Sequence, residues 1–365
     1  MESKYGFTTG TCAAIAAKAA ARMIFEGKAV LMESVDTPKG FIVETEIFKP
    51  TLEKGMASCA VRKYSGDDPD VTNGLMIFAC VKLNEKNTIT VDGGKGVGRV
   101  TKRGLSQNIG DAAINKTPKK MIIENVLSVF EKYNYEGGAD VIISVPDGEK
   151  AAEKTFNSRL GIIGGISILG TSGIVEPMSQ QAVIDTIKAE ISVKKENEGN
   201  YIMIAPGNYG IDFIKKSFDV DLNKAVKCGN FIGEALLFSK EKGFKGILLI
   251  GHIGKFIKLA GGIMNTHSLN ADGRMEILAA NTALVCDDLN VVRKIMECAT
   301  TDDAVKIIDV SGAREEVMER IIKKALFYVN NKLGQDIEVG IVMFSNVYGI
   351  LGKSDNVCDM LKYFR

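Results

Sequence analysis

Apolar and polar residues alternate with a period of two through much of residues 29–101, a pattern typical of β-strands. Runs such as FIVETEIF and LMIFACVKL are separated by turn-forming groups, among them Asp67-Asp68-Pro69 and Asn73-Gly74. Ahead of them, the alanine-rich segment from Ala13 to Phe25 has the composition of a helix. The first part of the chain is therefore predicted to be α+β, with an antiparallel or mixed sheet.

Strand-length apolar runs alternate with helical segments in the second half. The predicted strands are 201–205, 225–228 and a continuous apolar run that begins at Gly246. This alternation of strand and helix predicts a Rossmann-like parallel sheet. The rest of the chain is mainly helical, up to a last predicted strand at 337–344.

The pattern between these two regions is less regular. It predicts a helix over 121–133, a strand over 139–145 and a second helix that ends at Leu160. From Gly161 to Ser179, glycines and hydroxyl residues alternate with aliphatic residues. This composition suits a buried strand whose loop, 170–173, contacts a ligand, and it suits an ordinary loop equally well.

KKENEG, residues 194–199, is the most polar stretch of the chain and follows a predicted helix. A chain of 365 residues is also longer than one compact core usually holds. We therefore predict two domains with the active site between them. Residues 1–195 form a substrate-binding α+β domain, and residues 196–365 form a Rossmann-like α/β domain that binds the cofactor and carries the catalytic residues.

The composition argues against several classes of protein. Lys and Arg almost balance Asp and Glu, whereas a general nucleic-acid-binding protein has a basic excess. No apolar run is long enough to span a membrane, and the seven cysteines have no CxxC spacing, which indicates reduced thiols. We expect a cytoplasmic protein with a small-molecule substrate and no metal site of its own. Its oligomeric state stays open, with a homodimer as one alternative.

Both histidines of the sequence lie in GILLIGHIGKFIKLAGGIMNTHS, residues 246–268. His252 follows a predicted buried strand, and ligands of open α/β sheets bind beyond the carboxyl ends of the strands. Lys255 and Lys258 follow at helical spacing, and His267 lies in a polar cluster. We predict a functional site here. The alternative is a hydrogen-bonded core histidine beside an ordinary amphipathic turn.

Two segments of the first half have features of an anion-binding surface. YGFTTGTC, residues 5–12, opens a helix that Thr9 or Thr11 can cap, and the helix dipole favours an anion there; a plain N-cap is an equal alternative. GGKGVGRVTKRGL, residues 93–105, is basic and suits a substrate with several carboxylates, although a solvated charged edge has the same composition. It lacks the G-x-G-x-x-G spacing of a dinucleotide site.

Taken together, these segments resemble the cobalt-precorrin-5B C1-methyltransferases of anaerobic cobalamin biosynthesis, the CbiD family. The similar motifs follow one another along nearly the whole chain. They are TTGTCAA from Thr8, GGKGVGRVTKRGL from Gly93, DAAINKTP from Asp111, TFNSRLGIIGGISILGTSGIVEPMS from Thr155, APGNYG from Ala205, LLIGHIGKFIKLAGGIMNTHS and ADGRMEILA. The final residues, 336–365, contribute none of these motifs and are assigned no role.

The resemblance implies methylation of a cobalt-containing tetrapyrrole at C-1 by S-adenosylmethionine, converting cobalt-precorrin-5B into cobalt-precorrin-6A. Such a reaction needs aligned reactants and a base suited to neutral pH. The expected catalytic residues are His252, Lys255 and His267. The expected cofactor-binding residues are Gly207, Asn208, Gly210, Asn230 and Gly251. The expected substrate-binding residues are Thr9, Thr11, Lys95, Arg103, Thr171, Ser172, Lys258 and Thr266. Lys255 is also expected to lower the pKa of His252 by its proximity.

Two other functions are compatible with parts of the sequence. A non-catalytic tetrapyrrole or nucleotide carrier would use the same histidines as ligand contacts. A nicotinamide-dependent oxidoreductase would use the Rossmann-like half, but the missing glycine motif and the absence of an acidic ribose partner argue against it. Transfer of label from S-adenosylmethionine distinguishes the methyltransferase from the carrier.

Overall fold

The computed structural model describes residues 4–207, 215 and 218–364. The chain forms two compact units, Met1–Gln181 and Ala182–Arg365, each with its own mixture of helices and strands. The predicted mixed α/β class is therefore confirmed, but the boundary expected at residue 195 is wrong. Helix α4 (Gln180–Glu198) belongs to the second unit, because its Ile187 and Ile191 lie in the same hydrophobic core as the strands that follow.

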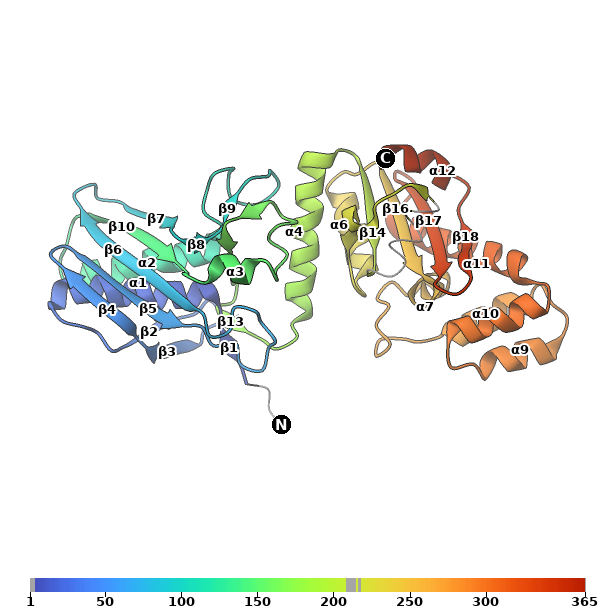
Figure 1. The fold of residues 1–365 in the computed structure, drawn as a ribbon, viewed down its shortest axis with the longest axis horizontal. Coiled ribbons are helices and arrows are strands. Elements are labelled where there is room, and N and C mark those ends of the chain that lie inside the picture. The colour runs from blue at the N-terminus through green and yellow to red at the C-terminus, as the bar shows by residue number, and fades with distance from the viewer. Residues whose placement is uncertain (1–3, 208–214, 216–217, 365) are drawn as a thin grey trace. The chain divides into compact units, whose positions relative to one another are not determined.

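The first unit is built on a five-stranded mixed sheet (Figure 1). Its strands, in spatial order, are β4 (Phe48–Glu53), β5 (Met56–Arg62), β6 (Met76–Asn84), β10 (Gly138–Ser144) and β7 (Ile89–Gly93). The pairs are antiparallel except for β10 with β7, which is parallel. This is the mixed sheet that the period-two pattern predicts.

Helix α1 (Thr9–Glu26) packs against this sheet and against α2 (Lys116–Lys132). All of its residues from Thr9 to Ala17 are buried. The alanines explain this burial, because small side chains let the backbone of α1 approach its neighbours on several sides. A separate two-stranded ribbon, β2 (Met32–Asp36) with β3 (Ile42–Glu46), lies beside them.

The segment 146–179 differs from its prediction. The second helix ends early, since α3 spans only Gly148–Ala152. The buried strand expected over 161–179 is replaced by three two-residue strands, because glycines with positive φ interrupt the extended backbone at Gly161, Gly164 and Gly170. The short pairs are β11 (Ile162–Ile163) with β9 (Arg99–Val100), β12 (Gly165–Ile166) with β8 (Gly96–Val97), and β13 (Ile174–Val175) with β1 (Gly6–Phe7).

The second unit is also built on a five-stranded sheet. Its strands, in spatial order, are β15 (Val226–Lys227), β14 (Tyr201–Ala205), β16 (Gly246–His252), β17 (Glu338–Ser345) and β18 (Gly349–Lys353). The first four are parallel, and β18 is antiparallel to β17. Numbered along the chain, the spatial order is 2-1-3-4-5, so the direction of winding changes between β14 and β16.

Central strand β16 is covered on both faces. Ile247 and Leu249 lie in a core shared with α4, α6 (Ile232–Glu241) and α11 (Arg314–Leu333). Leu248 and Ile250 lie in a second core, completed by α12 (Val357–Met360). The continuous apolar run follows from this arrangement, since a strand buried on both faces has no polar side.

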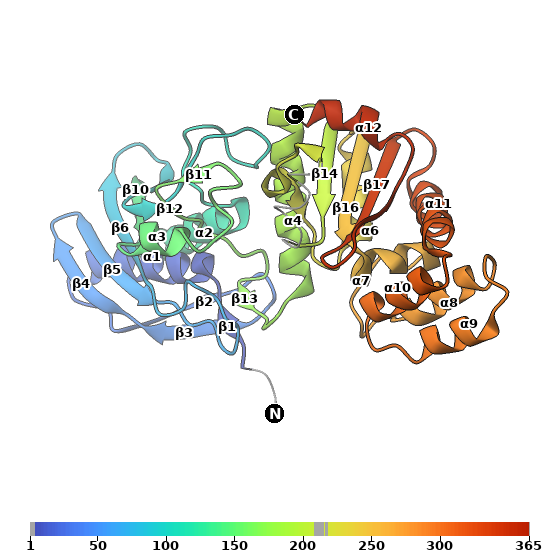
Figure 2. The same cartoon turned by 45° about the vertical axis from the view of Figure 1, so that its right-hand side comes forward.

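The remaining helices of the second unit gather beyond the end of β16 (Figure 2). They are α7 (Ile253–Phe256), η2 (Ile257–Gly261), α8 (Arg274–Thr282), α9 (Leu289–Met296) and α10 (Thr301–Val310). Short 3₁₀ turns η1 (Leu222–Lys224) and η3 (Leu361–Tyr363) lie elsewhere in the unit. None of the helices formed by the described residues is both long and apolar enough to cross a membrane.

Candidate functional site

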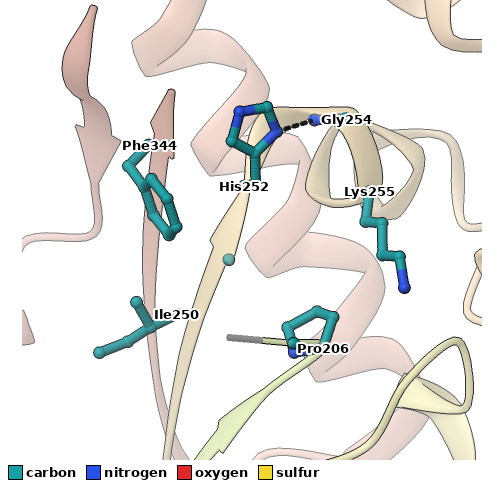
Figure 3. Close-up of a pocket in the computed structure, with 8 residues that line it drawn as sticks. Pro206, Ile250, His252, Gly254, Lys255 and Phe344 are labelled. Atoms are coloured by element: carbon teal, nitrogen blue, oxygen red, sulfur yellow. Dashed lines mark hydrogen bonds between the residues drawn. The ribbon is translucent and has the colours of Figure 1, made fainter. Parts of the chain in front are cut away.

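A pocket opens at the carboxyl edge of the second unit's sheet, between β14 and β16 (Figure 3). The residues that line it come from the ends of three parallel strands and from the first turn of α7. They are Pro206, Gly207, Ile250, Gly251, His252, Gly254, Lys255 and Phe344. The sequence prediction that places His252 at the carboxyl end of a strand is confirmed.

His252 is held by two neighbours. It is the N-cap residue of α7, and its Nδ1 accepts a hydrogen bond from the backbone N–H of Gly254 at 3.1 Å. Its ring meets Phe344 edge to face, with ring centroids 5.7 Å apart and an interplanar angle of 88°. The neutral tautomer that accepts the Gly254 bond carries its proton on Nε2. His252 therefore presents an Nε2–H donor in this arrangement.

The surroundings of His252 favour its neutral form. Burial lowers its pKa below the usual value of 6.5, and the charge of Asp302 partly opposes this effect. The folded protein then favours the neutral imidazole, so this contribution to stability is present above about pH 6.5 and is lost as the pH falls below it.

Lys255 does not cause this shift, contrary to the sequence-based expectation. Its side chain extends away from the imidazole of His252 (Figure 3), and its Nζ donates to the carbonyl of Gly229 at 3.4 Å. Burial lowers the pKa of Lys255 itself, and the charge of Lys258 adds to this effect. The direction predicted for the pKa of His252 is right, but its cause is burial.

Gly251, one of the expected cofactor-binding residues, has a packing role. A Cβ built on Gly251 would lie 2.2 Å from the ring of Phe256. The missing side chain therefore makes room for an aromatic ring of the core, although Gly251 also lines the pocket. Gly207, from the loop after β14, also lines the pocket, and Asn208 and Gly210 lie outside the described residues.

Lys258, Thr266 and Asn230 form one connected group. The buried Nζ of Lys258 donates to the carbonyls of Thr266 at 3.2 Å and Ala271 at 2.7 Å. The backbone N–H of Thr266 donates to the carbonyl of Asn230 at 3.0 Å, and the Thr266 hydroxyl donates to Oδ1 of Asn230 at 3.3 Å. Asn230 and Thr266, expected to bind different ligands, therefore contact each other, and Lys258 fixes the loop that follows η2.

We expect Lys258→Met to lower the free energy of unfolding by about 2 kcal/mol or more, because it leaves two carbonyls without their charged donor. Lys255→Met is the matched control, since Lys255 makes one long contact and is half-exposed. It should cost less than about 1 kcal/mol. Urea unfolding of both variants checks this, and equal midpoints would show that Lys258 does not hold the loop.

His267 is exposed and does not line the pocket around His252. The Nδ1 of His267 accepts a hydrogen bond from the backbone N–H of Leu269 at 3.2 Å, and the backbone N–H of His267 donates to Oδ1 of Asn265 at 3.1 Å. These local bonds shape a turn. The structure thus brings His252 and Lys255 to one pocket and leaves the third expected catalytic residue outside it.

In the first unit, the N-cap of α1 is Thr8 and not Thr9 or Thr11, because the Thr8 hydroxyl accepts from the N–H of Thr11 at 3.2 Å. Thr9 and Thr11 are buried. The Thr9 hydroxyl accepts from the N–H of Leu169 at 2.9 Å, and the Thr11 hydroxyl donates to the carbonyl of Gly173 at 2.7 Å. Both threonines therefore fasten the 169–173 loop to the start of α1.

The other residues expected to bind substrate lie nearer the surface. Lys95, Arg103 and Thr171 are exposed, and the hydroxyl of Ser172 donates to the carbonyl of Ile174 at 2.9 Å. In the described parts of the chain, no group of three or more His, Cys, Asp or Glu side chains is arranged to hold a metal ion.

Comparison with known proteins matches both ends of the chain to one family. The CbiD sequence pattern covers residues 1–177, and the pattern described as CbiD, C-terminal domain, covers residues 265–355. The chain belongs to the CbiD family. A relative from Ruminiclostridium cellulolyticum, named cobalt-precorrin-5B C(1)-methyltransferase, is 48% identical over 94% of this chain and 89% of its own length.

Two further proteins are similar to this chain. The Thermoanaerobacter protein of the same name is 43% identical over 96% of this chain and 95% of its own length. The 1.9 Å crystal structure of the cobalamin biosynthesis protein from Archaeoglobus fulgidus is 34% identical, covers 74% of this chain and 84% of that chain, and has a TM-score of 0.40.

Sequence reasoning missed three residues near the pocket of this CbiD chain. Phe344 packs against His252, Asp302 acts on it electrostatically, and Ser345 bonds to Asp302 at 2.7 Å. Phe344 and Ser345 could have been found, because they end an apolar run that predicts a parallel strand, and such ends share one edge of the sheet with His252. Asp302 gave no comparable signal, since it lies in an ordinary acidic first turn of a helix.

Proposed function

We propose that the protein methylates C-1 of cobalt-precorrin-5B with S-adenosylmethionine, giving cobalt-precorrin-6A in anaerobic cobalamin biosynthesis. One observation carries this proposal: the 48% identity, over 94% of the chain, to a protein named for that activity. The pocket at His252 supports it, because it combines apolar walls with a nearby cation at the edge of a parallel sheet.

We place the cofactor at the carboxyl edge between β14 and β16, in a Rossmann-like site. The order of the strands reverses there, and open α/β sheets with the order 2-1-3-4-5 bind ligands at this point. Pro206, Ile250 and Phe344 give apolar walls that fit an adenosyl group, and the ammonium of Lys255 fits a carboxylate. S-Adenosylmethionine, when bound, supplies an activated methyl group on its sulfonium.

We propose that the tetrapyrrole is held mainly by the first unit. Exposed Lys95 and Arg103 suit its carboxylates, since charge-assisted bonds to carboxylates are strong. Thr171 and Ser172 lie in the loop that buried Thr9 and Thr11 fasten, so the two threonines would act through this loop. Lys258 and Thr266 would likewise act by shaping the loop after η2.

Methyl transfer to carbon requires alignment of the sulfonium with the nucleophilic carbon and exclusion of water. We propose that His252 takes part through Nε2, because Gly254 engages Nδ1. If Nε2 donates a hydrogen bond, the bond from the Gly254 N–H to Nδ1 is kept. If Nε2 accepts a proton, the other neutral tautomer is required, and the bond from Gly254 is lost. Lys255 would pair with a carboxylate, and His267 would approach the ligands only by movement of its loop.

The test is turnover of cobalt-precorrin-5B with S-adenosylmethionine labelled in the methyl group. We expect label in the tetrapyrrole, a product heavier by one methyl group, and one S-adenosylhomocysteine per product. Binding of both compounds without transfer of label would overturn the proposal and favour a carrier. Addition of S-adenosylhomocysteine provides the control, because a ligand of the same site should inhibit the transfer.

A further inference from the structure

The N-terminus of α10 lies against the His252 pocket. Thr300 caps this helix, and Asp302 and Asp303 occupy its first turn, where the helix dipole favours a carboxylate. Thr301 packs close to the first turn of α7, since its Oγ1 lies 3.8 Å from the position that a Cβ on Gly254 would take. The N-cap of α7 and the first turn of α10 are thus neighbours, although they are distant in the sequence.

Asp302 is fixed in this position by Ser345. The buried hydroxyl of Ser345 donates to Oδ1 of Asp302 at 2.7 Å. The Ser345 hydroxyl oxygen also accepts hydrogen bonds from the backbone N–H groups of Val347 at 3.0 Å and Tyr348 at 3.3 Å. The hydroxyl has one proton to donate and two lone pairs, so these three bonds use its full capacity. The carboxylate is therefore anchored to the end of β17, one residue beyond the Phe344 ring that packs on His252.

The charges around His252 are few in the described parts of the chain. From α10, Asp302 acts on the imidazole and opposes the effect of burial on its pKa. From α7, Lys255 extends away from the ring (Figure 3). The pocket residues that come from β14, β16 and β17, apart from His252, carry no ionisable side chain. Asp302 therefore offsets part of the effect that burial has on the pKa of His252.

We propose that Asp302, anchored by Ser345 at the end of β17 beside the Phe344 ring, is a positioning residue for the methyl transfer that acts through the His252 imidazole. This inference rests on the proposed function, in which His252 takes part in the reaction. It assigns a role to the first turn of α10, which sequence and family resemblance leave without one.

The test compares Asp302→Asn with Asp303→Asn. Both substitutions remove one negative charge from the same helical turn, but Asp303 bonds to the Thr300 cap. Without a polyhistidine tag, the protein has two imidazoles, and His267→Asn assigns their NMR signals. In Asp302→Asn we expect the His252 titration to move to lower pH. Asp303→Asn should leave the His252 titration in place.

The pH profile of kcat/KM for the tetrapyrrole gives the second measurement. If neutral His252 is the working form, the acid limb should move to lower pH in Asp302→Asn, and the relative rate at acid pH should rise severalfold. An unchanged His252 titration would overturn the inference. A shifted titration with an unshifted acid limb would also overturn it, while leaving the methyltransferase activity established.

A failure of the proposed function gives a different result. In that case neither variant nor the parent protein transfers label, but the titration of His252 still responds to Asp302. Should Asp302→Asn not fold, Ser345→Ala tests the same anchor, because it frees the carboxylate without removing its charge. We expect a smaller change in the His252 titration in this variant, and no change would count against the anchor.

Discussion

Replacing His252 with Asn is expected to reduce the rate of single-turnover methylation about a hundredfold while leaving the fold intact. The Oδ1 of Asn can take the place of Nδ1 and accept from the Gly254 N–H, and Asn is a good N-cap residue. The group that this variant removes is Nε2. The comparison therefore separates the contribution of His252 to the reaction from its role as the cap of α7.

His252→Ala and His267→Asn complete the experiment. The Ala variant loses the cap as well and should unfold about 1 kcal/mol more easily than the Asn variant. His267→Asn removes the other imidazole, which lies outside the pocket, and should have the smaller effect on rate. Binding of S-adenosylhomocysteine and of the tetrapyrrole is measured separately for each variant. If His252→Asn methylates within a few-fold of the parent, a barrier change of roughly 1 kcal/mol or less, His252 only caps α7 and catalysis rests on alignment.

Much of the second unit could be predicted because its local pattern and its tertiary environment agree. The apolar run before His252 has no polar face, and the strand it forms is buried on both faces by two separate cores. The glycines after η2 end the helical segment, with Gly262 at a φ of 75°. These features depend on residues close to one another in the sequence.

The helix predicted to end at Leu160 shows where local patterns fail. The Thr155 hydroxyl donates to the carbonyl of Ala152 and accepts from the N–H of Asn157, so the chain leaves the helix there. The helical segment α4 was assigned to the wrong domain for a related reason. Its polar end KKENEG looks like a linker, but Lys195 donates to Asn200 and to the carbonyl of Gly243. Both errors reflect partners that composition does not identify.

The same limit applies to the site. Residue type marked His252 and Lys255 as candidates but did not identify their partners. The backbone N–H of Gly254 bonds to Nδ1 of His252, burial lowers the pKa of the imidazole, and the charge of Asp302 partly opposes this effect. Thr9 and Thr11 look like anion ligands in the sequence, whereas tertiary packing turns their hydroxyls toward the 169–173 loop. Spacing could not reveal this, because the loop follows the threonines at a long distance in sequence.

Gly207→Val is expected to weaken the binding of S-adenosylhomocysteine at least about tenfold, equivalent to 1.4 kcal/mol. Gly207 is the second residue after β14 and lines the pocket where the strand order reverses. A branched side chain there would occupy space that the proposed site leaves to the adenosyl group and would keep backbone donors from approaching it. Isothermal titration calorimetry measures the affinity, and thermal unfolding checks that the fold is unchanged.

Gly207→Ala gives a graded control, since one methyl group fills less of the pocket than three carbons do. We expect its affinity to lie between those of the parent and the Val variant. Tetrapyrrole binding should change little in either, because the proposed carboxylate contacts of Lys95 and Arg103 belong to the first unit. Unaltered cofactor affinity in both variants would place S-adenosylmethionine away from the β14–β16 edge. Loss of tetrapyrrole affinity with cofactor affinity retained would instead assign this edge to the substrate, because the added methyl groups would then displace the tetrapyrrole.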